Sequence, residues 1–373
     1  MVKNKKTILV ASDSFKGTLS SLEICRLFQN ESANRDDINL LTMPLADGGE
    51  GSLEAISHVL NGQFIETNIK DLYLSRRNIK YFVYKDKAYI ESANIVGMGL
   101  AKKDNNPGLV TTYGIGEQIK SIISRGIKDI YIFLGGSASN DGGVGLAAAL
   151  GTKFYNEQSE EFLPTGLTLK DIVKIDNSKA SKLLDGINIT ALSDVKSPFY
   201  GEEGAAYKFA AQKGASKDEI KLLDEGLRHL SDLIHRDLNI DISKIEGAGA
   251  AGGLGGGLYA FANAKIESGS STILDLYNFD NVLEQVDLVI TGEGKLDEQT
   301  SDGKLVSHIL KRTEKRNKDV IIVVGTADIS LLELQKYYKN VKKICEIGSK
   351  SRSFEENKAS ARDNYLRAIK EII

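Results

Sequence analysis

Short apolar runs alternate with longer amphipathic stretches along most of the chain, and this alternation constrains the fold more than any other feature. Each run has the length of a buried strand, and each following stretch has the length of a helix. The runs cover residues 7–11, 40–45, 129–134, 187–192, 288–291 and 320–324. Such an alternation predicts βα units and a mainly parallel sheet, so the expected fold class is α/β.

The alternation is interrupted between residues 63 and 92. Apolar and polar residues alternate with a period of two in 77–84 and again in 88–91, which predicts an antiparallel meander of strands. The C-terminal part returns to the βα pattern and closes with an amphipathic helix at 355–373. The meander therefore belongs to an insertion within an α/β chain.

The length of the chain predicts two domains, because its 373 residues exceed the roughly 250–300 at which a single core stops growing. We expect the first domain to combine residues 1–62 with 283–373, so that both chain ends build its parallel sheet. Residues 63–282 then form an inserted mixed α/β domain with the meander. We expect the active site in the cleft between the two domains.

Charge and hydropathy exclude several classes of partner. The 48 basic and 51 acidic side chains nearly cancel, which leaves no broad positive field for nucleic acid. No apolar run approaches the roughly 20 residues that span a bilayer, and the N-terminus lacks a signal-peptide core. The two cysteines, Cys25 and Cys345, are expected to be reduced core residues. We therefore predict a cytoplasmic protein with small-molecule ligands; a monomer and a homodimer both stay open.

A GxGxxG pattern occurs at Gly247, Gly249 and Gly252, whereas a Walker-type phosphate loop does not occur. The preceding residues, 241–246, are polar rather than a buried strand, and further glycines follow where a helix should start. This context argues against a dinucleotide-binding fingerprint. A tight turn remains an alternative, and we favour backbone amides that line a ligand pocket.

Acidic residues follow the ends of several predicted strands, where ligands of open α/β sheets bind. These residues are Asp13, Asp47, Asp141, Asp194 and Glu293. A single such aspartate is most often a helix cap. Five of them in corresponding places predict that at least two share one site. Carboxylates suit Mg²⁺, which brings substrate phosphates with it, and Lys16, Lys213 and Lys304 are candidates to balance phosphate charge.

The motif Asp-Gly-Gly-x-Gly occurs twice, beginning at Asp47 and at Asp141, each time between a predicted strand and a predicted helix. Glycines at such a place let the backbone approach a ligand and present N–H groups beside the positive end of the helix. The motif therefore favours an oxyanion. Simple turn geometry with the aspartate as a helix cap is the alternative.

Five motifs in one order give the chain a resemblance to a known family. They are ASDSFKG at 11–17, PLADGGEG at 44–51, GGSASNDGG at 135–143, QKGA at 212–215 and GEGKLD at 292–297. The chain resembles the bacterial glycerate kinases, which are distinct from the plant-type and MOFRL-containing glycerate kinases. The resemblance implies phosphorylation of D-glycerate by ATP with Mg²⁺, usually to 2-phosphoglycerate. It also implies two α/β domains, one of them Rossmann/flavodoxin-like.

Roles for individual residues follow as a hypothesis. Asp194 or Asp47 accepts the hydroxyl proton, and Lys16 and Lys213 stabilise the transferred phosphate. Asp194, Asp47 and Glu293 are candidate Mg²⁺ ligands. The candidate substrate- and phosphate-binding residues are Ser12, Asp13, Ser14, Gly48, Gly49, Glu50, Gly136, Ser137, Ser139, Asn140, Asp141, Gly142, Gly143, Glu293, Asp297 and Lys304.

Three alternatives to this function are kept open. The enzyme could give 3-phosphoglycerate as its product instead. A non-catalytic sensor of a sugar acid would keep the ligand pocket without turnover. A nicotinamide-dependent oxidoreductase, which rests on the Gly247–Gly252 pattern alone, is the third.

Overall fold

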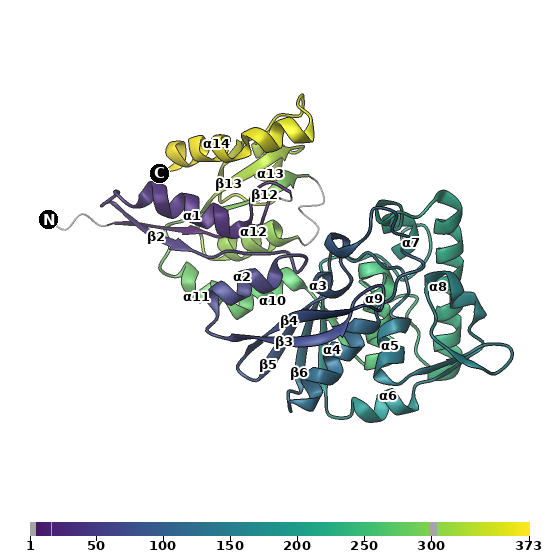
Figure 1. Ribbon diagram of the computed structural model, residues 1–373. Coiled ribbons are helices and arrows are strands. Elements are labelled where there is room, and N and C mark those ends of the chain that lie inside the picture. Colours follow the sequence, from purple (N-terminus) through teal and green to yellow (C-terminus); the bar gives the residue numbers. More distant parts are fainter. Residues whose placement is uncertain (1–4, 16, 298–303) are drawn as a thin grey trace. The chain divides into compact units, whose positions relative to one another are not determined.

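A computed structural model describes residues 5–15, 17–297 and 304–373 of the chain (Figure 1). The chain forms two compact units. The first, here called the terminal unit, comprises Met1–Asp47, Glu54–Leu60 and Ser270–Ile373; the second, the inserted unit, comprises Gly48–Leu53 and Asn61–Gly269. Each unit is described by itself.

The terminal unit contains a five-stranded sheet in the order β14-β13-β12-β1-β2, and all its neighbouring strands are parallel. The strands are β1 (Lys6–Val10), β2 (Ile38–Thr42), β12 (Leu288–Leu296), β13 (Asp319–Ala327) and β14 (Val341–Glu346). The prediction of a parallel sheet built from both chain ends is therefore confirmed. The direction of the strand order reverses between β1 and β12, which makes this pair the topological switch point.

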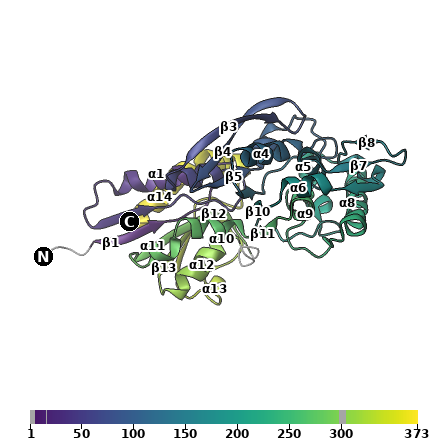
Figure 2. The ribbon, with the colours of Figure 1, turned by 90° about the horizontal axis from the view of Figure 1, so that it is seen from below.

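Helices cover both faces of this sheet. Figures 1 and 2 show α1 (Ser21–Ser32) and α14 (Phe354–Ile372) on one face and α12 (Leu305–Lys315) on the other. Ser20 and Ser353 begin α1 and α14 with capping boxes, in which the serine hydroxyl accepts a backbone N–H and a glutamate accepts the serine N–H. The remaining helices are α2 (Ser52–Val59), α10 (Gly269–Leu276), α11 (Phe279–Leu283) and α13 (Leu331–Leu334). Cys25 and Cys345 are buried and free, as predicted.

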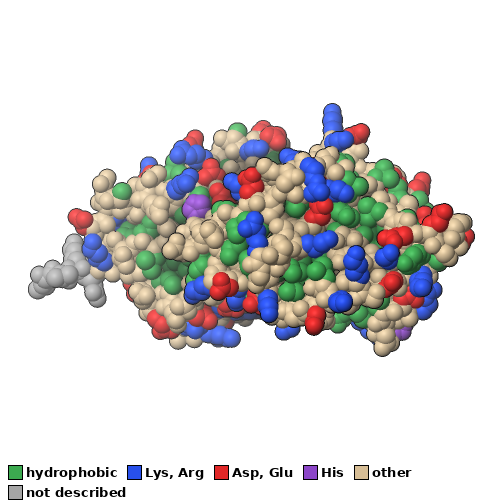
Figure 3. Space-filling model, turned by 60° about the horizontal axis from the view of Figure 1, so that its bottom comes forward, with side chains coloured by type: hydrophobic (Ala, Val, Ile, Leu, Met, Phe, Trp, Pro, Cys, Tyr) green, Lys and Arg blue, Asp and Glu red, His purple; other side chains and the backbone are tan. Residues whose placement is uncertain are grey.

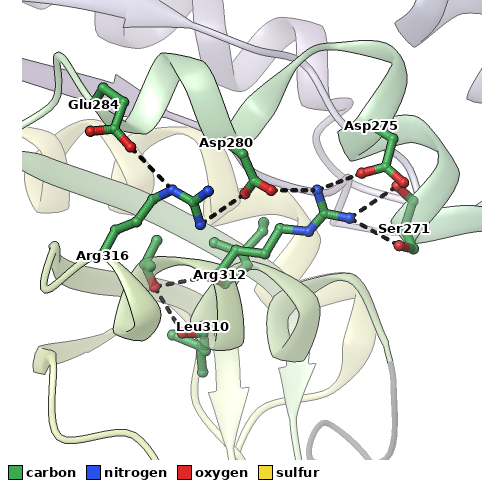
Figure 4. Close-up of polar contacts among 9 residues, drawn as sticks. Ser271, Asp275, Asp280, Glu284, Leu310, Arg312 and Arg316 are labelled. Carbon is green, nitrogen blue, oxygen red and sulfur yellow. Dashed lines mark hydrogen bonds and ion pairs between the residues drawn. The ribbon is translucent and has the colours of Figure 1, made fainter.

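Arg312 of α12 and Arg316, which directly follows α12, attach α10 and α11 to the terminal unit (Figure 4). Arg312 Nη1 lies 2.7 Å from Asp275 Oδ1 and 3.6 Å from Asp280 Oδ2. Arg316 lies 3.3 Å from Asp280 Oδ1 and 3.4 Å from Glu284 Oε1. These ion pairs explain why residues 270–282 pack with the terminal unit, although the sequence pattern places the domain boundary at 282. The boundaries at 62 and 282 stay predictions.

The inserted unit contains a mixed six-stranded sheet in the order β11-β10-β6-β5-β4-β3. Its strands are β3 (Gln63–Lys70), β4 (Arg76–Tyr84), β5 (Lys87–Glu91), β6 (Asp129–Phe133), β10 (Asn188–Leu192) and β11 (Lys265–Glu267). Strands β3, β4 and β5 are antiparallel, as the meander predicted, whereas β5, β6, β10 and β11 are parallel. The parallel strands end at one edge of the sheet.

Helices and a small sheet complete the inserted unit. The small antiparallel sheet has the order β8-β7-β9, with β7 at Lys153–Tyr155, β8 at Glu161–Phe162 and β9 at Lys174–Asp176. The α-helices are α3 (Ala93–Val96), α4 (Tyr113–Ser124), α5 (Val144–Leu150), α6 (Ser178–Leu183), α7 (Ala205–Phe209), α8 (Lys217–Leu238) and α9 (Ala250–Ala262). Three 3₁₀ turns lie at Met98–Leu100, Gly166–Asp171 and Ala211–Lys213.

Basic and acidic side chains are interspersed on the face shown in Figure 3, in keeping with their near-equal numbers. None of the helices in the described part of the chain is both long enough and apolar enough to cross a membrane.

Candidate active site

The switch point of the terminal unit carries acidic residues on both of its strands. Asp13 follows β1, and its N–H donates to the carbonyl of Gly292 in β12 over 3.0 Å. The Asp13 side chain is 8% exposed, and its Oδ1 accepts the Ser14 N–H at 2.6 Å. Ser12 Oγ donates to the same Gly292 carbonyl at 3.2 Å. The structure therefore places Asp13 beside Gly292–Glu293 at the edge where open α/β sheets bind ligands.

Asp47, Asp297 and Lys304 are further predicted residues of this unit that the structure describes, and each lies after a strand of the same sheet. Asp47 follows β2 and is half-buried. Asp297 follows β12, and Lys304 Nζ lies 3.9 Å from its Oδ1. Lys16 lies outside the described residues. Asp297 and Lys304 thus form one pair of opposite charges near the end of β12.

In the inserted unit, the segment 135–143 follows β6 and is held closely by two other glycine-rich segments. A β-carbon added to Gly135 would lie 2.4 Å from Gly49 Cα. On the other side, the Gly142 N–H donates to the Gly252 carbonyl at 3.1 Å. A β-carbon on Gly252 would lie 2.1 Å from the Ser139 carbonyl oxygen. The glycines of the three segments therefore permit backbone contacts that larger residues would block.

This packing explains the last glycine of the Gly247–Gly252 pattern. No strand precedes it, and α9 begins at Ala250 with three left-handed residues, Ala251, Gly252 and Gly253. A dinucleotide fingerprint needs a strand before the glycines and a regular helix after them. The described structure has neither. Of the three glycines of the pattern, Gly252 contacts segment 135–143, whereas an added β-carbon on Gly249 would lie 2.2 Å from the Pro198 carbonyl oxygen. The interpretation as amides that line a ligand pocket stays a prediction.

Substitution of Gly252 by alanine is expected to destabilise the protein strongly, because φ is +73° there and the new methyl group would meet the Ser139 carbonyl. Gly186 is the matched control, since its φ is +72° and nothing lies within 4 Å of an added β-carbon. We expect Gly186→Ala to cost about 1–2 kcal/mol and Gly252→Ala about 2–3 kcal/mol more. Urea denaturation of both variants measures the difference, and equal costs would contradict the packing described.

Asp141 is completely buried, and four protein donors bind its carboxylate. The Thr112 N–H and hydroxyl both donate at 2.8 Å, and the N–H groups of Gly143 and Gly145 donate at 3.1 and 3.4 Å. Burial raises the pKa of Asp141, and these hydrogen bonds oppose the rise. Asp141 therefore fixes the turn before α5, whose N-cap residue is Gly143. Its role as a ligand of the substrate stays a prediction.

Lys213 is a cationic residue that donates a hydrogen bond to segment 135–143. Its side chain is buried, and Nζ donates to the Ser139 carbonyl at 2.8 Å. Asn105 fixes the backbone, since its Nδ2 donates to the carbonyls of Lys213 at 2.8 Å and Ala138 at 3.2 Å. Burial lowers the pKa of Lys213 to about 7, and the charge of Asp141 acts in the opposite direction.

Asn140 differs from the other polar residues of this segment. Ser137 and Ser139 bond each other, with 2.9 Å between their hydroxyl oxygens. Asn140 is completely buried, yet neither Nδ2 nor Oδ1 has a hydrogen-bond partner within the described structure. Buried polar groups are almost always paired, and an exception calls for an explanation such as an absent ligand or water. Asn140 is therefore the clearest sign of a binding function in this unit.

Asp194 and Glu91 stand at the edge where the parallel strands of the inserted unit end. Asp194 follows β10, and its Oδ1 accepts the Ser268 hydroxyl at 2.6 Å. Glu91 ends β5, and its carboxylate accepts the N–H groups of Gly51 at 2.9 Å and Leu53 at 3.0 Å. Glu91 therefore secures the loop that contains the predicted residues Gly48, Gly49 and Glu50.

Sequence reasoning missed four residues that build this site, namely Glu91, Asn105, Thr112 and Ser268. Glu91 gave a signal, because it ends a predicted strand as the other acidic candidates do. The remaining three are ordinary polar residues whose importance depends on contacts distant in sequence.

Mg²⁺ needs oxygen ligands, and the acidic strand ends supply them. Within the described ranges, no group of three or more His, Cys, Asp and Glu side chains could hold a metal ion. Mg²⁺ commonly uses one or two carboxylates together with substrate phosphates and waters. Asp194, Asp47 and Glu293 stay proposed ligands on that basis.

Known proteins resemble this chain along nearly its whole length. The sequence profile of the glycerate kinase family matches residues 8–373. A glycerate kinase of Bacillus cereus is 35% identical over 369 residues, covering 98% of this chain and 96% of that protein. A glycerate 2-kinase of Escherichia coli is 33% identical, with coverages of 98% and 96%. A crystal structure of a candidate glycerate kinase 2 from Salmonella typhimurium matches with a TM-score of 0.82 and 32% identity, covering 99% of this chain and 97% of that one.

Proposed function

The chain belongs to the glycerate kinase family, and from this membership we propose that it transfers the γ-phosphoryl group of ATP to D-glycerate, giving 2-phosphoglycerate. It is a phosphotransferase with an alcohol group as acceptor. The observation in the structure that supports the proposal most directly is the acidic switch point of the terminal unit, formed by Asp13 after β1 and Glu293 in β12.

We assign the nucleotide to this edge of the terminal unit. Open parallel sheets bind their ligands beyond the carboxyl ends of the strands at the switch point. Carboxylate oxygens there suit Mg²⁺ bound to ATP, which supplies positive charge against the charge that develops on the transferred phosphoryl group. Lys304, which lies near Asp297, is the described cation that we assign to the phosphates.

The chain's own residues must also receive the hydroxyl proton and orient the acceptor. We assign proton acceptance to Asp194 or Asp47. A general base must lie within hydrogen-bonding distance of the hydroxyl and must be able to accept its proton, and we expect a carboxylate that follows a strand end to do both. Ser268 orients the Asp194 carboxylate through its hydrogen bond of 2.6 Å. Segment 135–143 positions the acceptor, with Lys213 as its cation. Lys16 keeps its proposed role beside the phosphates.

The remaining properties follow from the same proposal. ATP and D-glycerate are small-molecule partners, and the near balance of 48 basic and 51 acidic side chains gives no broad positive field for nucleic acid. Because ATP is a cytoplasmic metabolite, we place the enzyme in the cytoplasm, as a monomer or homodimer.

Ligand protection distinguishes the proposed kinase from its rivals. We expect ATP with Mg²⁺ to raise the melting temperature, because a ligand that binds the folded state stabilises it by about 2.7 kcal/mol at 100 times its Kd. NAD at the same concentration should leave the melting temperature unchanged. Protection by NAD without protection by ATP would favour an oxidoreductase, and protection by D-glycerate without any ATP hydrolysis or transfer would favour a sensor.

A further inference from the structure

Three parts of the inserted unit meet at the backbone of Ser139 and Asn140. Lys213 Nζ donates to the Ser139 carbonyl at 2.8 Å, and the left-handed turn at Gly252 contacts the same carbonyl. Asn140 follows directly, with both polar atoms of its buried side chain unpartnered in the described structure. Two residues that belong to or contact this stretch of backbone thus keep unused hydrogen-bonding capacity: two N–H groups of the Lys213 ammonium and both ends of the Asn140 amide.

We propose that Lys213 and Asn140 together recognise the 2-hydroxycarboxylate part of the acceptor, with Lys213 binding the carboxylate and Asn140 bridging the carboxylate and a hydroxyl. The inference rests on the proposed function and names the groups that select its acceptor. It replaces the assignment of Lys213 to the transferred phosphate.

The single positive charge of Lys213 favours a carboxylate over a polyphosphate as its ligand. Lys213 is the one lysine or arginine among the buried charged residues of the described chain. A single ammonium matches the single charge of a carboxylate, whereas the phosphates of ATP carry several charges and require several cations with Mg²⁺. The charge of Asp141 raises the pKa of Lys213. The Asp141 carboxylate, however, accepts hydrogen bonds from four other protein donors and forms none with Lys213 in the described structure. The ammonium therefore keeps donor capacity that the described protein groups do not use.

The amide of Asn140 gives a second, independent reason. Its Nδ2 donates and its Oδ1 accepts, so a complementary ligand must offer an acceptor and a donor side by side. A hydroxy acid offers both, because the carboxylate accepts and the hydroxyl donates. An ionised phosphate offers acceptors alone and would leave Oδ1 buried without a donor, which is unfavourable. The amide therefore matches the acceptor better than the nucleotide.

The backbone around this pair is fixed in advance. Asn105 ties Lys213 to Ala138 through its two hydrogen bonds, and a β-carbon on Gly214 would lie 2.0 Å from the Asn105 carbonyl oxygen. The Asn140 N–H donates to the Pro107 carbonyl at 2.8 Å. A site held in this way orders few groups on binding, which favours specificity.

The principal experiment compares Lys213→Met with Lys208→Met in the full-length protein. Lys208 lies on α7 and pairs with Glu203 at the surface, so it serves as the matched control. We expect Lys213→Met to raise the Kd and KM for D-glycerate about 10²-fold, since hydrogen bonds to charged groups contribute about 1.5–3 kcal/mol. The Kd for ATP with Mg²⁺ should change less than about threefold, and Lys208→Met should match the wild type. A larger loss for ATP, or equal losses for both ligands, would overturn the proposal.

Proton uptake supplies a readout that a purely structural lysine would not give. A carboxylate binds the protonated ammonium, so binding raises the pKa of Lys213 from its value of about 7 in the free protein. D-glycerate binding at pH 8 should therefore take up a proton, and its affinity should fall as the pH rises above about 7. Calorimetry in buffers of different ionisation enthalpy measures this uptake in the wild type. Absence of uptake, or uptake that persists in Lys213→Met, would contradict the assignment.

Asn140→Leu tests the second group at nearly constant volume. We expect about a tenfold loss of D-glycerate affinity without a lower denaturation midpoint, because the replaced polar atoms have no protein partner to lose. Unchanged affinity in a folded variant would remove Asn140 from the site. If the wild type itself neither binds nor phosphorylates D-glycerate, the proposed function fails first; if it does both and the two variants retain affinity, this inference alone fails.

Discussion

Asp194→Asn is expected to lower kcat about 10²- to 10³-fold, the size of effect that single electrostatic groups commonly contribute. Asparagine has nearly the same size as aspartate. It also keeps an oxygen that can accept the hydrogen bond from the Ser268 hydroxyl, which is 2.6 Å long to Asp194 Oδ1 in the wild type. The fold should therefore survive, while the capacity to accept a proton or bind Mg²⁺ is lost. Initial-rate kinetics with D-glycerate and ATP measure the effect.

The matched control for this substitution lies at the other end of the same strand. Asp185 precedes β10 and is exposed, so Asp185→Asn should leave kcat unchanged. Asp47→Asn and Asp13→Asn should each reduce kcat to a similar degree as Asp194→Asn. Near-normal turnover in all three variants would remove the proposed catalytic site.

Asp141→Ala is expected to reduce the free energy of unfolding by about 3–5 kcal/mol. The change leaves four buried donors without their acceptor, and a buried unsatisfied donor costs about 1–3 kcal/mol before the structure relaxes. Asp141→Asn retains one oxygen and should cost less. Urea denaturation, or the yield of soluble protein if the variant does not fold, measures the loss.

Asp241→Ala provides the comparison, because Asp241 is exposed and its Oδ1 accepts the N–H and the hydroxyl of Ser243, at 2.9 and 2.6 Å. We expect that variant to lose about 1 kcal/mol or less. An Asp141→Ala protein with unchanged stability but impaired D-glycerate binding would show instead that Asp141 serves the ligand. The pair of variants therefore separates the two roles that the sequence leaves open for Asp141.

Strands and their order of succession were predictable because they depend on local periodicity. The apolar runs and the period-two alternation of 77–84 correspond to observed strands, since burial on one or both faces fixes the pattern. Both cysteines pack in the core for the same reason. Features that depend on contacts between distant segments could not be seen. The attachment of α10 and α11, for example, rests on Arg312 and Arg316.

The candidate site shows the same division. The acidic residues at strand ends were identified, because parallel strands end at one edge of a sheet. The two Asp-Gly-Gly-x-Gly motifs were indistinguishable in sequence, although Asp141 is bound by Thr112 from another segment. Asn140 was selected with its neighbours, and only the structure shows that both polar atoms of its buried amide lack a partner among the described residues. Local sequence patterns therefore locate the candidate site. Contacts in the folded chain are needed to separate residues that support its backbone, such as Asp141, from residues proposed to bind the ligand, such as Asn140.

Phosphorus NMR of the reaction mixture tests the proposed function most directly. The wild-type protein is incubated with D-glycerate, ATP and Mg²⁺, and the phosphorylated products are followed over time. We predict a growing 2-phosphoglycerate signal that matches the ADP formed, and no such signal when D-glycerate is replaced by glycerol. A 3-phosphoglycerate signal would correct the hydroxyl that is phosphorylated, and the absence of any phosphorylated glycerate would contradict the assignment as a glycerate kinase.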